Sequence, residues 1–222
     1  MKLHKVVLGT VAAVALASVT TSVSAGGSLK DEKRPFSWTG FYVGGHVGVL
    51  NGNTATVPCG GGTCVNADPE GVLAGVQIGY NYQFKYLVVG VEGDYSFSDA
   101  SGEKDCANAA FSCRTEVENQ ASVRGRIGLA WDRALFYGTA GWAWADVSGQ
   151  TVIKATGQTF ADKTNRGGAI YGGGIDVAVS NHVIVGFEYL RADFDTKNHQ
   201  YDVTYPVKME TDTYRARVNF KF

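Results

Sequence analysis

The sequence lacks any stretch rich in Lys and Arg, and it has no excess of basic residues, with 20 Lys and Arg against 21 Asp and Glu in 222 residues. Proteins that bind nucleic acid usually carry a basic surface for the phosphate backbone, so this balance argues against a nucleic-acid partner. Runs of helix-favouring residues are also scarce. Glycine, by contrast, accounts for 29 residues and aromatic residues for 12% of the chain. The composition therefore favours an all-β fold.

The short motifs of common catalytic sites are also missing. The sequence contains neither a Gly-x-Ser-x-Gly elbow nor a His-Glu-x-x-His metal pair. His46, His182 and His199 are far apart in the sequence. The glycines at residues 172–174 lie in a segment that alternates as a strand, without the helix that a nucleotide loop requires. We therefore expect no enzymatic activity, no catalytic residue, no metal site and no cofactor.

The N-terminus has the pattern of a secretory signal peptide. Lys2 and Lys5 precede an apolar stretch at residues 6–19, and the small residues at 23–25 offer a cleavage site after Ala25. The apolar stretch is shorter than the roughly 20 residues that a membrane-spanning helix requires. We therefore expect residues 1–25 to act as a signal peptide and to be removed on export.

Four cysteines form two local pairs in polar segments, Cys59 with Cys64 and Cys106 with Cys113. In an oxidising compartment two local disulfides are the simplest pairing, although three connectivities are open to four cysteines. A zinc site is the competing interpretation, but no histidine lies near either pair at the usual ligand spacing. The pattern favours disulfides.

Apolar residues recur at every second position in eight segments of the remaining chain, which is the periodicity of β-strands. The first segment alternates Phe41, Val43 and Val47 with Tyr42 and His46. Tight turns lie near residues 85, 132 and 181, and long polar connections occupy residues 50–70, 98–114, 148–166 and 195–210. Short turns at one end and long loops at the other predict an all-β, eight-stranded antiparallel up-and-down barrel.

The face opposite the apolar residues decides between a transmembrane barrel and a soluble one of the lipocalin kind. This face carries charges of both signs, which can fill a narrow interior as a paired network. We expect the following residues to be barrel-interior charges: Glu92, Asp94, Glu118, Arg124, Arg126, Asp176, Glu188, Arg215 and Arg217. Aromatic residues lie at the strand ends next to the short turns, as an interfacial girdle requires: Trp38, Phe41, Phe84, Tyr86, Trp131, Tyr137, Phe220 and Phe222.

These features predict a transmembrane barrel at residues 38–222, preceded by a short periplasmic segment at residues 26–37. In the fourth strand Val117 shares the apolar, lipid-facing side with Val123. In the fifth strand Trp142 and Trp144 share a face with Asp146, so which of its faces points outward stays open.

Three segments are similar to a known family. Residues 38–48 (WTGFYVGGHVG) resemble the first strand of the small alphaproteobacterial outer-membrane proteins of the RopB type, which are similar to the Bartonella hemin-binding proteins and, more distantly, to the OmpA transmembrane barrel. Residues 186–191 (GFEYLR) and 214–222 (YRARVNFKF) match as well. The resemblance covers almost all of the chain after the signal peptide. It implies the barrel fold and a location in the outer membrane.

The C-terminal strand adds partners to this expectation. Tyr214, Val218, Phe220 and Phe222 occupy alternate positions up to the terminal Phe, which resembles the signal recognised by the outer-membrane assembly machinery. Read without the resemblance, the same pattern is a lipid-facing strand that ends in the girdle. The expected partners are therefore outer-membrane lipid, lipopolysaccharide and the assembly machinery.

Three functions remain open from the sequence. The first is a structural or surface-interaction role, in which the barrel anchors four extracellular loops and supports envelope integrity. The second is a narrow porin-like channel, although eight strands leave little free lumen. The third is capture of a host or environmental ligand such as hemin by the loops, where His199, Tyr201 and Tyr205 lie close together in the last connection. Of these we expect the first.

Overall fold

The structure is a computed structural model of the chain, and it describes residues 36–54, 58–59, 62–63, 69–105, 111–153, 156, 159–200 and 204–222. The expected signal peptide at residues 1–25 and nearly all of the segment at 26–37 lie outside these ranges. Within them, no helix has the length and apolar character needed to cross a membrane.

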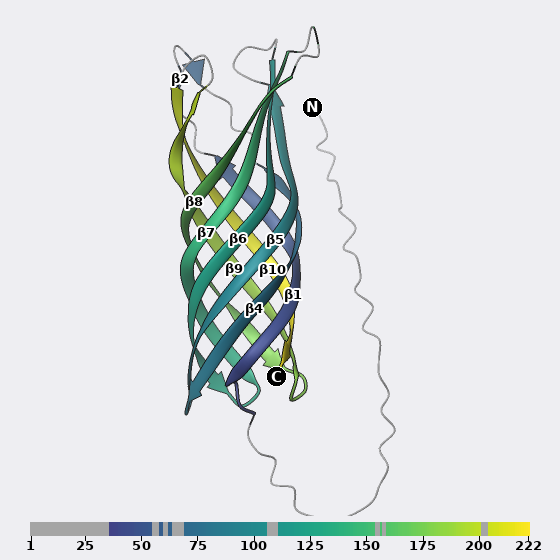
Figure 1. Cartoon of the computed structure of the whole chain (residues 1–222), viewed down its shortest axis with the longest axis vertical. Coiled ribbons are helices and arrows are strands. Elements are labelled where there is room, and N and C mark those ends of the chain that lie inside the picture. Colours follow the sequence, from purple (N-terminus) through teal and green to yellow (C-terminus); the bar gives the residue numbers. More distant parts are fainter. Residues whose placement is uncertain are drawn as a thin grey trace, which may run out of the picture. The chain divides into compact units, whose positions relative to one another are not determined.

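Eight long strands form a closed antiparallel barrel in the order β1-β10-β9-β8-β7-β6-β5-β4 (Figure 1). The strands of the barrel are β1 (Gly40–Thr54), β4 (Glu70–Phe84), β5 (Leu87–Asp105), β6 (Phe111–Trp131), β7 (Ala134–Ile153), β8 (Thr159–Ala178), β9 (Val183–Gln200) and β10 (Thr204–Lys221). Two short strands, β2 (Pro58–Cys59) and β3 (Gly62–Thr63), pair with each other. Closure occurs at β1, where Val43 pairs with Ile78 of β4 and with Phe220 of β10. The predicted eight-stranded up-and-down barrel is confirmed.

Two of the short turns contain a non-glycine residue with positive φ. Lys85 has a φ of 55° between β4 and β5, and Asp132 has a φ of 51° between β6 and β7. Two-residue hairpins favour positive φ because that backbone twist matches the twist of the flanking strands. Each of these turns joins two strands that are consecutive in the sequence, and it therefore places the interior residues of the two strands side by side.

Alternation along each strand divides the side chains into an outward apolar set and an inward polar set. On β1, Phe41 and Val47 are exposed at 62% and 55%, whereas Tyr42 and His46 are almost completely buried. On β7 the side with Trp142 faces outward, at 43% exposure. The exposed apolar side chains surround the barrel as a belt, which is the surface that a lipid bilayer covers.

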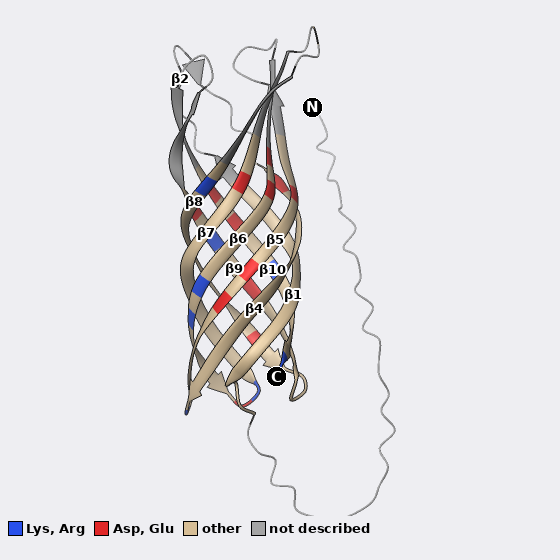
Figure 2. Ribbon diagram, viewed as in Figure 1, with Lys and Arg blue, Asp and Glu red and all other residues tan. Residues whose placement is uncertain are grey.

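The outward row changes from apolar to polar at a similar height on every strand of the barrel. We call the first polar residues above the belt the outer collar: Asn51, Glu70, Asp99, Asn119, Asp146, Asn165, Arg191 and Asp212. Figure 2 shows acidic residues gathered around the barrel toward the end with the long connections. Since a membrane-spanning β-strand needs only about 9–11 residues, strands of 15–21 residues extend beyond the membrane.

The long polar connections expected from the sequence are therefore mostly strand. β5 and β6 stay paired up to Asp105↔Ser112, and β7 and β8 up to Val152↔Thr159. The sequence showed no alternation here because a strand outside the membrane does not need an apolar face toward lipid.

Three side chains lie differently from the sequence expectation. Trp38 and Tyr137, expected in the outer aromatic girdle, are 1% and 7% exposed and point inward. Val117, expected on the lipid-facing side, is also buried. The cause for Val117 is a register shift between Val117 and Asn119 against β7, because one extra residue moves the side chains beyond it to the other face.

Two apolar clusters lie inside the barrel, one toward each end. The lower cluster, next to the short turns, comprises Phe36, Trp38, Val88, Ala130, Leu135, Tyr137, Ala178 and Ile184. The upper cluster, toward the long connections, comprises Leu50, Leu73, Ala100, Val117, Ala143, Ala145, Val147, Ile170, Leu190, Ala192, Phe194 and Met209. Most of the buried charges lie between these two layers, whereas Arg166 pairs with Ala145 at the level of the upper cluster and is also buried.

Candidate functional site: the charged barrel interior

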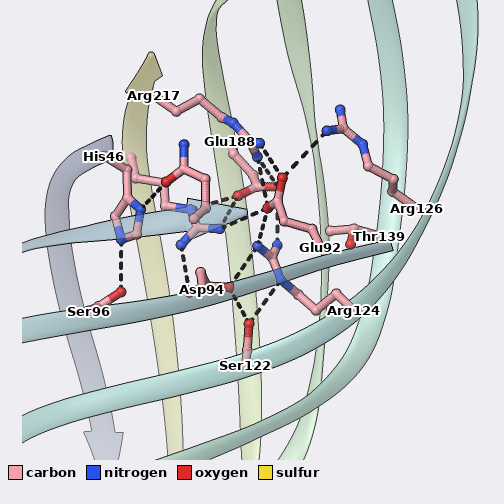
Figure 3. Close-up of polar contacts among 12 residues, drawn as sticks. His46, Glu92, Asp94, Ser96, Ser122, Arg124, Arg126, Thr139, Glu188 and Arg217 are labelled. Carbon is pink, nitrogen blue, oxygen red and sulfur yellow. Dashed lines mark hydrogen bonds and ion pairs between the residues drawn. The ribbon is translucent and has the colours of Figure 1, made fainter. Parts of the chain in front are cut away.

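Arg124 on β6 is bound by carboxylates from two other strands. Its Nη2 lies 2.7 Å from Glu92 Oε1 and 3.0 Å from Asp94 Oδ2 on β5, and its Nη1 lies 3.1 Å from Glu188 Oε1 on β9. Ser122 accepts a hydrogen bond from Arg124 Nε and donates one to Asp94. Figure 3 shows these side chains converging from different strands. The guanidinium therefore links parts of the barrel wall that are not sequence neighbours.

Arg215 and Arg217 on β10 complete the contacts of these carboxylates. Arg215 Nε donates to Glu188 Oε2 at 2.6 Å, and its Nη1 lies 3.2 Å from Asp94 Oδ1. Arg217 Nη2 forms an ion pair with Glu92 Oε2, and its Nη1 lies 3.2 Å from Glu188 Oε1. Glu92 and Glu188 thus each face several guanidinium groups.

Arg126 forms the lower edge of this layer. Its Nη2 lies 2.7 Å from Asp176 Oδ2 on β8, and its Nη1 lies 3.5 Å from Glu92 Oε2. Its guanidinium carbon lies 3.8 Å from the centroid of the Tyr137 ring, close enough for a cation–π contact. Tyr137 also donates to Glu188 at 3.0 Å, which explains why this aromatic residue points inward and not into the girdle.

The layer carries no net charge. Four arginines (Arg124, Arg126, Arg215 and Arg217) face four carboxylates (Glu92, Asp94, Asp176 and Glu188), and all of them are at most 6% exposed in their side chains. Buried charges are retained only when partners and hydrogen bonds replace the lost water. Removing one partner of such a pair typically costs about 3–5 kcal/mol. The layer therefore holds together as one unit.

Glycines on the inward face make room for this layer. A Cβ on Gly186 of β9 would overlap with the Asp176 carboxylate, and a Cβ on Gly79 of β4 would overlap with the Tyr42 hydroxyl. By contrast, a Cβ atom on Gly125 would lie 3.9 Å from the nearest carbonyl oxygen, and one on Gly138 would lie 3.8 Å from its own nearest carbonyl oxygen. Glycine is thus needed where the backbone approaches a large polar side chain.

His46, absent from the expected interior charges, belongs to a neutral group beside the layer. Its Nδ1 lies 2.5 Å from Gln77 Oε1 and its Nε2 lies 2.8 Å from Ser96 Oγ, as Figure 3 shows in part. Tyr42, on the same strand as His46, links β1 to the charged layer, because its hydroxyl donates a hydrogen bond to Glu92 at 2.6 Å. The alternation along β1 would have indicated that Tyr42 and His46 point inward, because both share the inward face with glycines.

Glu118, the remaining expected interior charge, lies at an irregular point of β6. It is partly exposed and sits at the register shift between Val117 and Asn119. The bulge breaks the alternation that assigned it to the interior. Among the described residues, no group of three or more His, Cys, Asp or Glu could hold a metal ion.

The expected disulfides lie outside the described residues: Cys64 and Cys106 fall in undescribed segments, and for Cys59 and Cys113 only the backbone is described. Of the loop cluster expected to capture a ligand, only the backbones of His199 and Tyr205 are described. His199 and Tyr205 pair across the β9–β10 ladder, and Tyr201 lies outside the described ranges.

The closed barrel with an apolar belt defines a transmembrane β-barrel protein. The sequence matches the outer membrane protein beta-barrel domain over residues 10–222. It is 30% identical over 207 residues to the 31 kDa outer-membrane immunogenic protein of Brucella melitensis biotype 1, covering 84% of this chain and 85% of that protein. The chain therefore belongs to the outer membrane protein beta-barrel family and is an integral protein of the outer membrane.

Two further comparisons agree with this membership. The chain is 30% identical over 174 residues to the 22 kDa outer membrane protein of Rhizobium leguminosarum bv. viciae, covering 75% of this chain and 69% of that protein. The crystal structure of OprG from Pseudomonas aeruginosa superposes with a TM-score of 0.55 at 13% identity, covering 83% of this chain and 96% of that one. The resemblance to small alphaproteobacterial outer-membrane barrels is confirmed, while the narrower likenesses to the RopB type and to hemin-binding proteins stay predictions.

Proposed function

We propose that this protein is a sealed barrel that supports the outer membrane and anchors extracellular strands for surface interactions, without conducting solutes and without catalysis. The observation that carries this proposal is the balanced layer of four arginines and four carboxylates, enclosed between two apolar clusters. A pore needs a continuous path of water, and an apolar layer above and below the charges interrupts such a path.

The packing of the interior supports the same conclusion. Eight strands enclose an interior just wide enough to be filled by side chains. The cavity between the charged layer and the upper cluster, lined by Asp94, Ser122 and Arg215 among others, has a volume of about 10 Å³. That is about the space that one water molecule requires. The narrow-channel alternative needs far more room.

The outer surface supports the proposed lipid partners. The apolar belt lies where acyl chains pack, and the outer collar lies at the height of headgroups, which for the outer leaflet are those of lipopolysaccharide. Tyr214, Val218 and Phe220 point outward on β10, and Phe222 directly after it is exposed as well, at 43–68% exposure. They present an apolar row to a factor that recognises the final strand.

A solute-flux assay tests the sealed barrel. Proteoliposomes that contain the refolded protein are mixed with an isosmotic solution of a small sugar, and swelling is followed by light scattering. We expect the swelling rate to equal that of empty liposomes. Swelling that rises in proportion to the amount of protein would overturn the proposal in favour of the channel.

The assembly role of the last strand has its own test. Replacing Phe222, which is 68% exposed, by Ser removes the terminal aromatic side chain. We expect less folded protein in the outer membrane, measured as the fraction that migrates faster on an unboiled gel. Phe41→Ser is the matched control, because Phe41 is 62% exposed and lies on the same side of the neighbouring strand. Equal losses in both variants would contradict a special role for the terminus.

A further inference from the structure

A chain of buried hydrogen bonds crosses four neighbouring strands of the barrel, including the first and the last. His46 on β1 lies at its centre, with Nε2 2.8 Å from Ser96 Oγ on β5 and Nδ1 2.5 Å from Gln77 Oε1 on β4. Gln77 Nε2 lies 2.7 Å from Asn219 Oδ1 on β10. These four residues are at most 4% exposed, so their polar atoms need partners inside the barrel. Figure 3 shows the His46 ring bonded at both nitrogens.

Glycines hold the side chains of this chain of hydrogen bonds in place. A Cβ on Gly75 of β4 would lie 2.6 Å from His46 Nε2, and a Cβ on Gly44 of β1 would overlap the Asn219 amide. Larger residues at these positions would displace the ring and the amide. One freedom is left that needs no extra room, because a side-chain amide turned by 180° keeps its shape while its oxygen and nitrogen exchange places.

Arg217 on β10 distinguishes the two orientations of the Asn219 amide. A guanidinium group only donates hydrogen bonds. Arg217 Nε lies 3.7 Å from Asp176 Oδ1, which is too far for a hydrogen bond. With the Asn219 oxygen turned toward Arg217, that oxygen lies 3.2 Å from Nε and 3.3 Å from Nη2. This orientation gives Arg217 Nε an acceptor, whereas the opposite one sets the amide nitrogen against it.

The acceptor for Arg217 fixes the direction of the whole chain. The Asn219 nitrogen then faces Gln77, so Gln77 must turn its oxygen toward it and its nitrogen toward His46 Nδ1. An imidazole ring that accepts at Nδ1 carries its proton on Nε2, from which it donates to Ser96. His46 is uncharged in this arrangement, which we call the neutral chain.

A second proton on His46 reverses the chain. Both nitrogens of a charged imidazole donate, so Gln77 must present its oxygen to Nδ1. Gln77 Nε2 then donates to Asn219 Oδ1 and, at 3.3 Å, to the carbonyl oxygen of Gly45. The Asn219 nitrogen comes to face Arg217. In this arrangement, which we call the protonated chain, Arg217 loses its amide acceptor.

The charges around His46 add to this effect. Its surroundings on β1, β4, β5 and β10 comprise Tyr42, Gln77, Asp94, Arg215 and Arg217. Asp94 is the one carboxylate of this set, and it is already paired with Arg215 at 3.2 Å and with Arg124 at 3.0 Å. A charged His46 would therefore meet two guanidinium groups without a carboxylate of its own.

A proton has a route to the ring from the upper side of the charged layer. The cavity of about 10 Å³ is lined by Ser96 as well as by Asp94 and Arg215. It has room for about one water molecule. A water molecule in that space would lie next to the hydroxyl group that bonds His46 Nε2.

We propose that His46 is an acid-sensitive switch of the sealed interior. When it takes up a proton, the chain through Gln77 and Asn219 reverses, Arg217 loses an acceptor, and the charged layer loosens. Histidine is the side chain that ordinarily changes its charge between about pH 5 and about pH 8. This inference rests on the proposed sealed barrel and names a regulation of the same interior.

Nuclear magnetic resonance of the imidazole nitrogens tests the direction of the chain in the full-length protein in lipid nanodiscs. The signal of His46 is identified by its absence from the spectrum of His46→Gln. At about pH 8 we expect the proton on Nε2 and an unprotonated Nδ1. At about pH 5 we expect protons on both nitrogens, together with a shift of the Arg217 Nε signal. In Asn219→Ala, His46 should still take up its second proton, while the Arg217 Nε signal should no longer follow.

Urea unfolding tests the consequence for the charged layer. We expect the unfolding equilibrium constant of the wild-type protein to rise about tenfold from about pH 8 to about pH 5, as for the loss of one hydrogen bond to a charged group. His46→Gln, which cannot titrate, should lose this rise. The matched control is His182→Gln, because His182 is exposed in the turn between β8 and β9 and should leave the rise unchanged.

Three results would overturn the inference: a proton on Nδ1 at about pH 8, a His46 that stays uncharged at about pH 5, or a rise in unfolding that His46→Gln retains in full. The first two are measured on the wild-type protein and do not depend on how the variants fold. Solute flux at about pH 8 tests the proposed function separately. A conducting barrel would overturn that function, whereas a sealed barrel with an unresponsive His46 would overturn the switch alone.

Discussion

Arg124 and Glu92 occupy directly opposed positions on β6 and β5, and their side chains meet inside the barrel at 2.7 Å between Nη2 and Oε1. Neither side chain is more than 2% exposed. Because Arg124 also contacts Asp94 and Glu188, its positive charge balances carboxylates from two strands. This arrangement makes Arg124 the centre of the sealed interior.

Replacing Arg124 by Leu leaves Glu92, Asp94 and Glu188 with fewer cationic partners. We expect the free energy of unfolding to fall by about 3–5 kcal/mol, the typical result of removing one member of a buried ion pair. Urea titration in detergent measures this change. Arg191→Leu is the control, since Arg191 pairs with Glu210 on the outer surface at 35% side-chain exposure, and we expect its midpoint to stay close to wild type.

Arg126 and Asp176 allow a balanced replacement. Among the described residues, Arg126→Leu leaves Asp176 with Arg217, at 3.7 Å, as its remaining ion-pair partner and should destabilise the barrel clearly. The double variant with Asp176→Leu removes one charge of each sign, so we expect it to be more stable than the single variant. A double variant that is less stable than Arg126→Leu would show that the two residues do not act as a pair.

Trp38 closes the lower end of the interior against Leu135 and Val88, and its ring lies 5.0 Å from that of Phe36. Trp38→Ala removes a large buried side chain, so we expect a loss of about 3–5 kcal/mol in the free energy of unfolding. Trp131→Ala serves as the control because Trp131 is 81% exposed. Equal effects in the two variants would place Trp38 in the outer girdle.

Gly186 tests the close packing around the charges. Gly186→Ala forces the Asp176 carboxylate to move, and we expect a loss of about 1–3 kcal/mol from overpacking. Gly125→Ala has room for the added methyl group and should stay near wild type. The ratio of folded to unfolded bands on unboiled gels reports the difference. A neutral Gly186→Ala would contradict the tight interior.

Much of the fold follows from alternation within single strands. The apolar residues of β1 and the turn at residues 85–86 predict a hairpin barrel, and the charges opposite them predict a polar interior. The inward positions of Arg124 and Glu92 could be predicted in this way, because both strands alternate regularly around them. The same alternation predicts the outward row of β10 up to Phe222.

Other features depend on relationships that one strand does not contain. The bulge at Glu118 inverts the facing of Val117, and a sequence pattern does not reveal which residue is the extra one. The upper apolar cluster brings Leu50, Leu73 and Phe194 together from strands that are far apart in sequence. Strand extension above the membrane also has no periodic signal, because lipid does not require an apolar face there. The inward orientation of the Tyr137 side chain could be predicted only if Arg126 and Glu188 were already known to lie beside it.

Single-channel recording of the refolded wild-type protein in planar lipid bilayers tests the sealed interior most directly. A sealed interior predicts a baseline without steady conductance steps, because apolar clusters enclose a charged layer that carries no net charge. Arg124→Glu, recorded under the same conditions, should produce openings, since it places a carboxylate among Glu92, Asp94 and Glu188. Steady conductance of the wild-type protein, unchanged by Arg124→Glu, would contradict the account.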